Sequence, residues 1–340
     1  MPSMTKPVVL VTSTTVSQQA RNLLQDAGID IAFMQGPITE SALVAEFSRQ
    51  AVAAVILRGP SPFTAAVFAA ARHLKVIAKH GAGIDSVDLA SATRHGVAVM
   101  VTRGANSEAV AEHALALMLS LVRELPRLDS GLRKGIWKDP RHIVRDFRER
   151  VVGIVSYGQI GRQMARLALA CGAKVIVHSR SRAALPPEME WDDTLEGLLV
   201  RADIVSLHCP LTGETRGMIG DRELALMKPG ALLVNTSRGK LIDEPALIAA
   251  LQGGQLAGAG LDVFATEPPG TDNPLLALPN VICTPHIAAS TTGAGARMGT
   301  IAAESIIRFL RGEIHDRGNL VNPEVLEPAS AESWAPSRHG

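Results

Sequence analysis

The sequence has few cysteines, almost no net charge and no long apolar run. Cys171, Cys209 and Cys283 are widely separated and form no CxxC pair, which indicates a reducing compartment and no disulfide framework. The 340 residues carry a net charge of +1 at pH 7, so charge favours neither nucleic acid nor a membrane surface as a partner. The longest apolar stretch, residues 109–122, is too short to span a bilayer and contains Glu112 and His113. We expect it to form a buried or subunit-contacting helix.

The sequence also shows no spacing typical of metal ligands and no layout typical of a targeting segment. His80, His113 and His286 have no ligand-like neighbours at useful spacing, so we expect no metal site. The first residues, MPSMTKPVVLVTSTT, run into a strand-like segment without the layout of a signal peptide. Together with the cysteine usage, this predicts a cytoplasmic protein. The length allows two domains with sizeable cores.

Short apolar runs alternate with helical patterns along most of the chain. Up to about residue 103 the predicted strands cover residues 8–12, 53–57, 75–79 and 98–102. This alternation predicts a parallel sheet with helices on both faces. Residues 151–286 contain enough further strands for a complete doubly wound domain. Residues 324–340 are rich in Pro, Ser and Glu and read as a tail.

Residues 151–182 read as strand, tight turn, helix and strand. The turn is a GxGxxG pattern whose first glycine is replaced by serine, and it runs Ser156-Tyr157-Gly158-Gln159-Ile160-Gly161. Such a turn lets a diphosphate approach the backbone and lie at a helix N-terminus. Serine resists positive φ, so we expect a conformational cost at its position. The alternative is an ordinary βαβ unit with a Gly-rich turn.

Two loops in the first hundred residues follow predicted strands, where α/β sheets bind ligands. One loop contains Arg58 and Gly59, and the other contains Gly81, Ala82 and Gly83. The glycines could present backbone N–H groups to a carboxylate. The alternative is a pair of glycine turns beside a solvated arginine.

Seven segments between residues 80 and 300 carry a resemblance to a known family. They are HGAGIDSVD (80–88), NSEAVAEHALALML (106–119), VGIVSYGQIGR (152–162), LHCPLTGETRGMI (207–219), NTSRGKLIDEPAL (235–247), AGLDVFATEP (259–268) and TPHIAAST (284–291). The chain resembles the NAD(P)-dependent D-2-hydroxyacid dehydrogenases, which include glyoxylate/hydroxypyruvate reductases, phosphoglycerate dehydrogenase and formate dehydrogenase. It departs from their pattern at Ser156 and at residues 144–150.

The resemblance implies an α/β fold with two Rossmann-like domains. A flavodoxin-like substrate domain, residues 1–103 plus 287–323, would contain an inserted, doubly wound NAD(P)-binding domain at residues 104–286. Residues 324–340 would form a tail. The active site would lie in a cleft, with the two domains able to close on the substrate.

The resemblance also implies three catalytic residues. His286 would donate the proton during reduction and accept it during oxidation, since imidazole changes its charge near neutral pH. Glu267 would orient the imidazole and favour its protonated form. Arg238 would bind the substrate carboxylate in bidentate fashion and polarise the carbonyl.

By the same resemblance, further residues would bind the coenzyme or the substrate. Asp262 would hold the nicotinamide carboxamide. The remaining positions form two groups: for the coenzyme, Ser156, Tyr157, Gly158, Gln159, Ile160, Ser179, Arg180, Arg182, His208, Cys209, Pro210, Thr215, Thr236, Ser237 and Val110; for the substrate, Arg58, Gly59, Gly81, Ala82, Gly83 and Asn106.

The end of the second strand of the coenzyme domain bears on the choice of coenzyme. NAD-binding proteins of this kind normally carry an acidic residue there, which accepts hydrogen bonds from the ribose. This chain has Ser179, followed by Arg180 and Arg182. Losing the acid removes repulsion of a 2′-phosphate, and the arginines supply positive charge. We therefore predict NADP(H), with NAD(H) as the alternative. The non-functional alternative is a solvated basic turn that binds no ligand.

The sequence leaves the substrate and the partners open. Arg58 could bind a second anion such as a phosphate, but no cluster of positive groups accompanies it. A small unphosphorylated 2-keto acid, glyoxylate or hydroxypyruvate, is therefore our first prediction. D-3-phosphoglycerate dehydrogenase is the alternative. A dinucleotide-sensing, corepressor-like interaction protein is the alternative from another class. The resemblance also implies a homodimer, with residues 109–122 and the segment around Trp137 in contact.

Overall fold

The computed structural model describes residues 6–137, 142–313 and 318–327. Its internal contacts divide the chain into two compact units. The first comprises residues 1–106 and 292–340, and the second comprises residues 107–291. The boundaries of the substrate domain and the inserted coenzyme domain, at residues 103/104 and 286/287, stay a prediction.

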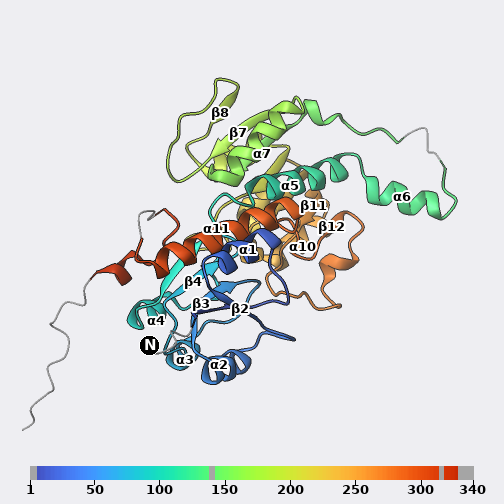
Figure 1. The fold of residues 1–340 in the computed structure, drawn as a ribbon. Coiled ribbons are helices and arrows are strands. Elements are labelled where there is room, and N and C mark those ends of the chain that lie inside the picture. Colours follow the sequence, from blue (N-terminus) through green and yellow to red (C-terminus); the bar gives the residue numbers. More distant parts are fainter. Residues whose placement is uncertain (1–5, 138–141, 314–317, 328–340) are drawn as a thin grey trace, which may run out of the picture. The chain divides into compact units, whose positions relative to one another are not determined.

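The first unit is built on a five-stranded parallel sheet, drawn in blue and cyan in Figure 1. Its strand order is β2-β1-β3-β4-β5, which is the flavodoxin-like order. The strands are β1 (Val8–Val11), β2 (Asp30–Phe33), β3 (Val52–Leu57), β4 (Val76–Lys79) and β5 (Ala98–Val101). Strand β2 was not predicted, because its four residues lie at the sheet edge and none of them is fully buried.

Helices from both ends of the chain cover this sheet. They are α1 (Gln18–Asp26), α2 (Glu40–Arg49), α3 (Ala65–Ala70), α4 (Leu89–Arg94) and α11 (Thr292–Leu310). Helix α11, red in Figure 1, packs against α1. Its small residues allow a close approach, because a Cβ at Gly299 would lie 2.5 Å from Ser17 Oγ at the start of α1.

The second unit has a seven-stranded parallel sheet with the order β12-β11-β10-β9-β6-β7-β8. The order reverses between β6 and β9, as in doubly wound dinucleotide-binding folds. The predicted α/β fold with two Rossmann-like sheets is therefore confirmed. The strands are β6 (Val151–Val155), β7 (Lys174–His178), β8 (Met189–Trp191), β9 (Ile204–Leu207), β10 (Ala231–Asn235), β11 (Leu256–Leu261) and β12 (Val281–Cys283).

Helices cover both faces of this second sheet. One hydrophobic cluster joins the strands to α5 (Ser107–Val122) and α7 (Gln159–Ala170). The other joins them to α8 (Leu195–Arg201), α9 (Asp221–Leu226) and α10 (Glu244–Gln252). The apolar run at 109–122 is thus part of a core, since Leu117 and Met118 of α5 are buried. No helix in the described part of the chain is long and apolar enough to cross a membrane.

The segment 128–150, whose sequence is charged and shows little periodicity, is partly helical. It contains most of α6 (Leu125–Arg133) and the short 3₁₀ helix η1 (Phe147–Glu149). The sequence did not show α6 because no residue of that helix is buried. Part of the predicted tail is also ordered, since η4 (Pro323–Leu326) is a 3₁₀ helix. The rest of that tail, from residue 328, lies outside the described residues. Two further 3₁₀ helices are η2 (Gly239–Leu241) and η3 (Pro274–Ala277).

Candidate active site

The Gly-rich turn lies at the end of β6, where the strand order of the second sheet reverses. Ser156 has φ +78°, a left-handed conformation, and its N–H donates to His178 O at 2.7 Å. A Cβ at Gly161 would lie 2.1 Å from Ser156 O, so only glycine lets α7 begin this close to the turn. A Cβ at Gly158 would meet nothing within 4 Å. The turn is therefore closed towards the helix and open above Gly158.

The start of α7 offers backbone donors to an anion. The first N–H groups of an α-helix have no partner within the helix, and its dipole favours negative charge there. Gln159 and Ile160 are the first helical residues. The Tyr157 side chain is buried, with its hydroxyl 3.5 Å from Met189 Sδ, so only its backbone is left for a ligand. The turn thus fits a diphosphate.

Two buried polar atoms at neighbouring strand ends have no partner in the described part of the chain. They are His208 Nδ1 and Thr236 Oγ1, which follow β9 and β10. Burial lowers the pKa of His208 to about 4, so its ring is neutral at pH 7, and its Nε2 lies 3.0 Å from Ser206 Oγ. Buried polar groups normally have partners. These two unpartnered atoms therefore fit a polar ligand that lies across the two strand ends, such as a dinucleotide.

Other residues predicted to bind the coenzyme use their side chains within the protein. Thr215 Oγ1 donates to Pro210 O at 2.7 Å, and Ser237 Oγ donates to Leu207 O at 2.8 Å. Cys209 is buried, which raises the pKa of its thiol to about 11. Val110 is buried in the first turn of α5. These side chains shape the loops, and the prediction that they contact a coenzyme stays untested.

His286 and Glu267 form a close pair after β12 and β11. His286 Nδ1 lies 2.6 Å from Glu267 Oε2, and half of the imidazole is exposed. The second carboxylate oxygen, Oε1, accepts from Phe264 N–H at 3.1 Å. Burial raises the pKa of Glu267, but the hydrogen bonds from His286 and Phe264 and the charge of Arg238 outweigh it, so the net pKa is lowered. The ionised carboxylate favours the proton on Nδ1, and Nε2 is the ring nitrogen that takes no part in this contact.

Arg238 lies at the end of β10, immediately before η2. Its Nη1 donates to Ser237 O at 2.6 Å. Asn235, which is buried, holds this loop: its Nδ2 donates to Arg238 O and its Oδ1 accepts from Ser237 N–H. A Cβ at Gly239 would lie 1.9 Å from the Phe264 carbonyl carbon. The loop therefore passes directly over the segment that carries Glu267.

Asp262 supports the loop that carries His286. Its carboxylate accepts from Thr284 Oγ1 at 2.6 Å and from Ile287 and Ala288 N–H at 2.9 Å each. Its carbonyl accepts the N–H of His286, which has φ +52°. A carboxylate has about four acceptor sites, so these three bonds leave about one for a carboxamide, and that contact stays a prediction. We therefore see Asp262 foremost as the support of His286.

Two supporting residues were missed by the sequence analysis. His113 Nε2 of α5 lies 2.9 Å from Thr284 Oγ1, which in turn donates to Asp262. Asn235 is the other. The only signal in the sequence was an asparagine at a strand end followed by Thr-Ser-Arg-Gly, which is typical of an Asx turn.

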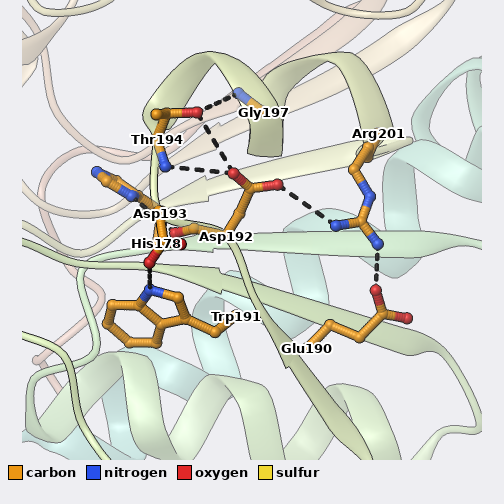
Figure 2. Close-up of polar contacts among 8 residues, drawn as sticks. All are labelled: His178, Glu190, Trp191, Asp192, Asp193, Thr194, Gly197 and Arg201. Carbon is orange, nitrogen blue, oxygen red and sulfur yellow. Dashed lines mark hydrogen bonds and ion pairs between the residues drawn. The ribbon is translucent and has the colours of Figure 1, made fainter.

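The turn after β7 carries both arginines of the coenzyme prediction, and each has an acidic partner. Arg180 Nη1 lies 3.9 Å from Glu214 Oε2, and Arg182 Nη1 lies 3.3 Å from Asp193 Oδ1. Figure 2 shows β8 and the acidic residues that follow it, where Trp191 Nε1 of the strand donates to the same Asp193 oxygen. Although Ser179 stands where an acidic residue is usual, Glu214 and Asp193 still place negative charge beside this turn.

The substrate residues predicted in the first unit lie at the ends of β3 and β4. Arg58 Nη1 donates to Thr15 O at 2.7 Å, and burial lowers the pKa of its guanidinium. Gly59 O accepts from Lys79 Nζ. Gly81 N–H already donates to Thr102 Oγ1 at 2.9 Å, which leaves Ala82 and Gly83 as the freer donors of the loop.

The last substrate prediction, Asn106, immediately precedes α5, at the boundary of the two units. No group of three or more His, Cys, Asp and Glu side chains in the described ranges could hold a metal ion.

The fold and the site together define a doubly wound dinucleotide-binding protein with an Arg, Glu and His at the strand ends. The family model for the NAD-binding domain of D-isomer specific 2-hydroxyacid dehydrogenases matches residues 115–288. The chain belongs to the D-isomer specific 2-hydroxyacid dehydrogenase family.

Three relatives illustrate the range of this similarity. A glyoxylate reductase of Korarchaeum cryptofilum is 38% identical, over 95% of this chain and 98% of the relative. A D-3-phosphoglycerate dehydrogenase of Mycobacterium tuberculosis is 40% identical over 95% of this chain. The chain spans only 61% of that relative's length. The crystal structure of an NADPH-dependent glyoxylate/hydroxypyruvate reductase from Sinorhizobium meliloti superposes with a TM-score of 0.81 at 27% identity, covering 94% of this chain and 99% of that one.

Proposed function

We propose that this protein is an oxidoreductase that transfers a hydride between NAD(P)H and a small 2-keto acid, forming a D-2-hydroxy acid. The observation that carries the proposal is the pair of His286 and Glu267, 2.6 Å apart, next to the charge of Arg238. A nicotinamide coenzyme supplies the hydride when it is bound. The protein must bind the carboxylate, protonate the oxygen and hold the carbonyl in place.

Each of the three residues has one role in this reaction. His286 holds one proton on Nδ1 for Glu267 and delivers another from Nε2 to the keto oxygen. Glu267 stabilises the charged imidazole and fixes its orientation. The Arg238 guanidinium binds the substrate carboxylate and polarises the carbonyl. In the oxidative direction, His286 Nε2 takes the proton back.

We assign glyoxylate or hydroxypyruvate as the favoured substrates. Relatives over nearly the whole chain include a glyoxylate reductase, and one structural relative is a glyoxylate/hydroxypyruvate reductase. D-3-phosphoglycerate remains the alternative because the chain also resembles such dehydrogenases, although it spans about 60% of their length. The loops with Arg58, Gly59, Ala82 and Gly83 stay our prediction for substrate recognition.

We favour NADP(H) over NAD(H), by about tenfold or ~1.4 kcal/mol. The turn after β7 has Ser179 in place of the usual acid, with Arg180 and Arg182 beside it. The Sinorhizobium meliloti relative is described as NADPH-dependent. An Arg180→Ala variant should lose the preference.

Initial rates test the proposal directly. NADPH and NADH oxidation is followed by absorbance with hydroxypyruvate, glyoxylate, 3-phosphohydroxypyruvate and pyruvate. We expect the highest kcat/KM with NADPH and one of the first two acids. Glu267→Gln should lower kcat by about 10²-fold or more, in the range of general acid–base catalysis. The exposed Glu304→Gln serves as a matched control. Turnover of none of the four acids would refute the proposed function.

We also propose a homodimer, in which the segment around α6 covers a second copy. Leu125, Leu132 and Ile136 are more than half exposed and Trp137 is 84% exposed. Such a run of exposed apolar side chains is typical of an interface. A monomer mass in light scattering at micromolar concentration would refute it. A cytoplasmic location stays our prediction from the three free cysteines.

A further inference from the structure

Two loops that flank the Gly-rich turn are joined by an ion pair. Arg180 follows β7, and Glu214 lies in the loop after β9. Strands β7 and β9 are the two neighbours of β6, whose end forms the Gly-rich turn. The Arg180–Glu214 pair, 3.9 Å apart, therefore links the loops on either side of the candidate coenzyme site.

The second arginine of the turn is held differently. Arg182 pairs with Asp193, and its guanidinium lies 5.8 Å from the centre of the Trp191 ring. Asp193 also accepts the indole N–H of Trp191 at 3.0 Å. Losing this pair would leave both Trp191 and Arg182 without their acceptor. Arg182 thus belongs to the structure that joins the β7 exit to β8.

Figure 2 shows the network around Asp193, the acid of this second pair. Asp192, next to Asp193, accepts from Thr194 N–H at 3.2 Å and from Arg201 Nη1 at 3.3 Å. Its carboxylate fills the space beside Gly197, where a Cβ would lie 2.1 Å from Asp192 Oδ1. His178 Nδ1 lies 3.1 Å from Asp192 O. The segment carrying Asp193 is therefore attached to both α8 and β7.

Arg180 and Glu214 have no such attachment in the described part of the chain. Their side chains are 87% and 82% exposed. No further contact of the Glu214 carboxylate is found among the described residues. Exposed ion pairs of this kind are weak and easily exchanged. A phosphate dianion can replace a carboxylate on an arginine and form a stronger, bidentate contact.

We propose that Glu214 is a specificity-determining residue, which competes with the 2′-phosphate of NADP(H) for Arg180. The inference rests on the proposed preference for NADP(H). Arg180 is then the arginine that binds the phosphate, while Arg182 remains on Asp193. Glu214 weakens the preference in two ways, since it occupies Arg180 and repels the phosphate. One unit charge at about 4 Å in water is worth about fivefold in affinity.

Titration calorimetry of the full-length protein with NADP⁺ and NAD⁺ tests the inference without turnover. We expect Glu214→Gln to lower the Kd for NADP⁺ about fivefold and to change that for NAD⁺ less than twofold. The gain should fall below twofold in an Arg180→Ala background, because no arginine is left to release. Glu304→Gln on α11 makes the same charge change in the other unit and should have no effect. Asp193→Asn should give no gain in affinity and should alter the tryptophan fluorescence.

The outcomes separate this inference from the coenzyme proposal. If Arg180→Ala weakens NADP⁺ but Glu214→Gln matches the wild type, or keeps its gain without Arg180, only the role of Glu214 is overturned. An equal gain in Asp193→Asn would overturn it as well. If the wild type binds NAD⁺ at least as tightly, or Arg180→Ala leaves NADP⁺ binding unchanged, both proposals fail.

Discussion

Replacing Ser156 with glycine should stabilise the protein. Ser156 has φ +78° at the end of β6, a conformation that costs an L-residue ~1–2 kcal/mol. Glycine adopts it freely but loses ~0.5–1 kcal/mol more chain entropy on folding. No hydrogen bond of the Ser156 hydroxyl is found within the described ranges, so its loss adds little. The balance predicts a net gain of about 0.5–1 kcal/mol in the free energy of unfolding.

Urea unfolding followed by tryptophan fluorescence measures this gain. Ser156→Ala is the matched control, because alanine removes the hydroxyl but keeps the Cβ that opposes positive φ. We expect Ser156→Gly to raise the urea midpoint and Ser156→Ala to leave it unchanged or lower it. If alanine stabilises as much as glycine, the hydroxyl and not the backbone conformation is responsible, and the reasoning is refuted.

Three further predictions concern the glycines, a buried histidine and Asp262. Gly161→Ala should destabilise the protein by ~1–3 kcal/mol, because its Cβ would lie 2.1 Å from Ser156 O. Gly158→Ala should leave the melting temperature unchanged but weaken dinucleotide binding. The reverse pattern in the two variants would contradict this prediction. The pKa of His208 is about 4 in the folded protein, and ~6.5 in the unfolded chain. Between these two pH values the unfolded chain binds a proton that the folded protein does not. The free energy of unfolding therefore has its full value above pH ~6.5 and is lower by on the order of 2 kcal/mol at pH 5. His208→Gln should reduce this difference in urea titrations at pH 5 and 7. Asp262→Asn turns an acceptor of three hydrogen bonds partly into a donor, which should cost ~1–3 kcal/mol in unfolding experiments and lower kcat more than it raises KM; a change in KM alone would favour a role in binding.

Long, regular patterns in the sequence predicted most of the second sheet. The run from Val151 to Arg182 shows strand, turn, helix and strand, and the structure has β6, α7 and β7 there. Strand β8 was missed because its three residues, Met-Glu-Trp, are too few to show a period, and only Met189 is buried. Helix α6 was missed because it has no buried face. In both cases the tertiary context determines the secondary structure, and the local sequence pattern gives little sign of it.

The resemblance implied the three proposed catalytic residues, Arg238, Glu267 and His286, but only part of their support. Asp262 was named in another role, and His113 and Asn235 were not predicted. His113 lies 171 positions before its partner Thr284, and no local pattern links them. The acids Asp193 and Glu214 likewise lie well beyond Arg182 and Arg180 along the sequence, and they come to lie beside the turn only in the folded chain. A charge count along the sequence therefore overstates the positive field that a coenzyme meets.

Two of the non-glycine residues with positive φ, Ser156 and His286, show different relations between backbone strain and function. No hydrogen bond of the Ser156 side chain is found within the described ranges, so we expect glycine at this position to relieve the strain without losing a side-chain contact. His286 has φ +52°, and Asp262 accepts its backbone N–H and those of Ile287 and Ala288. Strained residues persist where their surroundings over-determine them. The conformation of His286 is therefore maintained by Asp262, and a change there should misplace the imidazole although Asp262 itself touches neither Nδ1 nor Nε2.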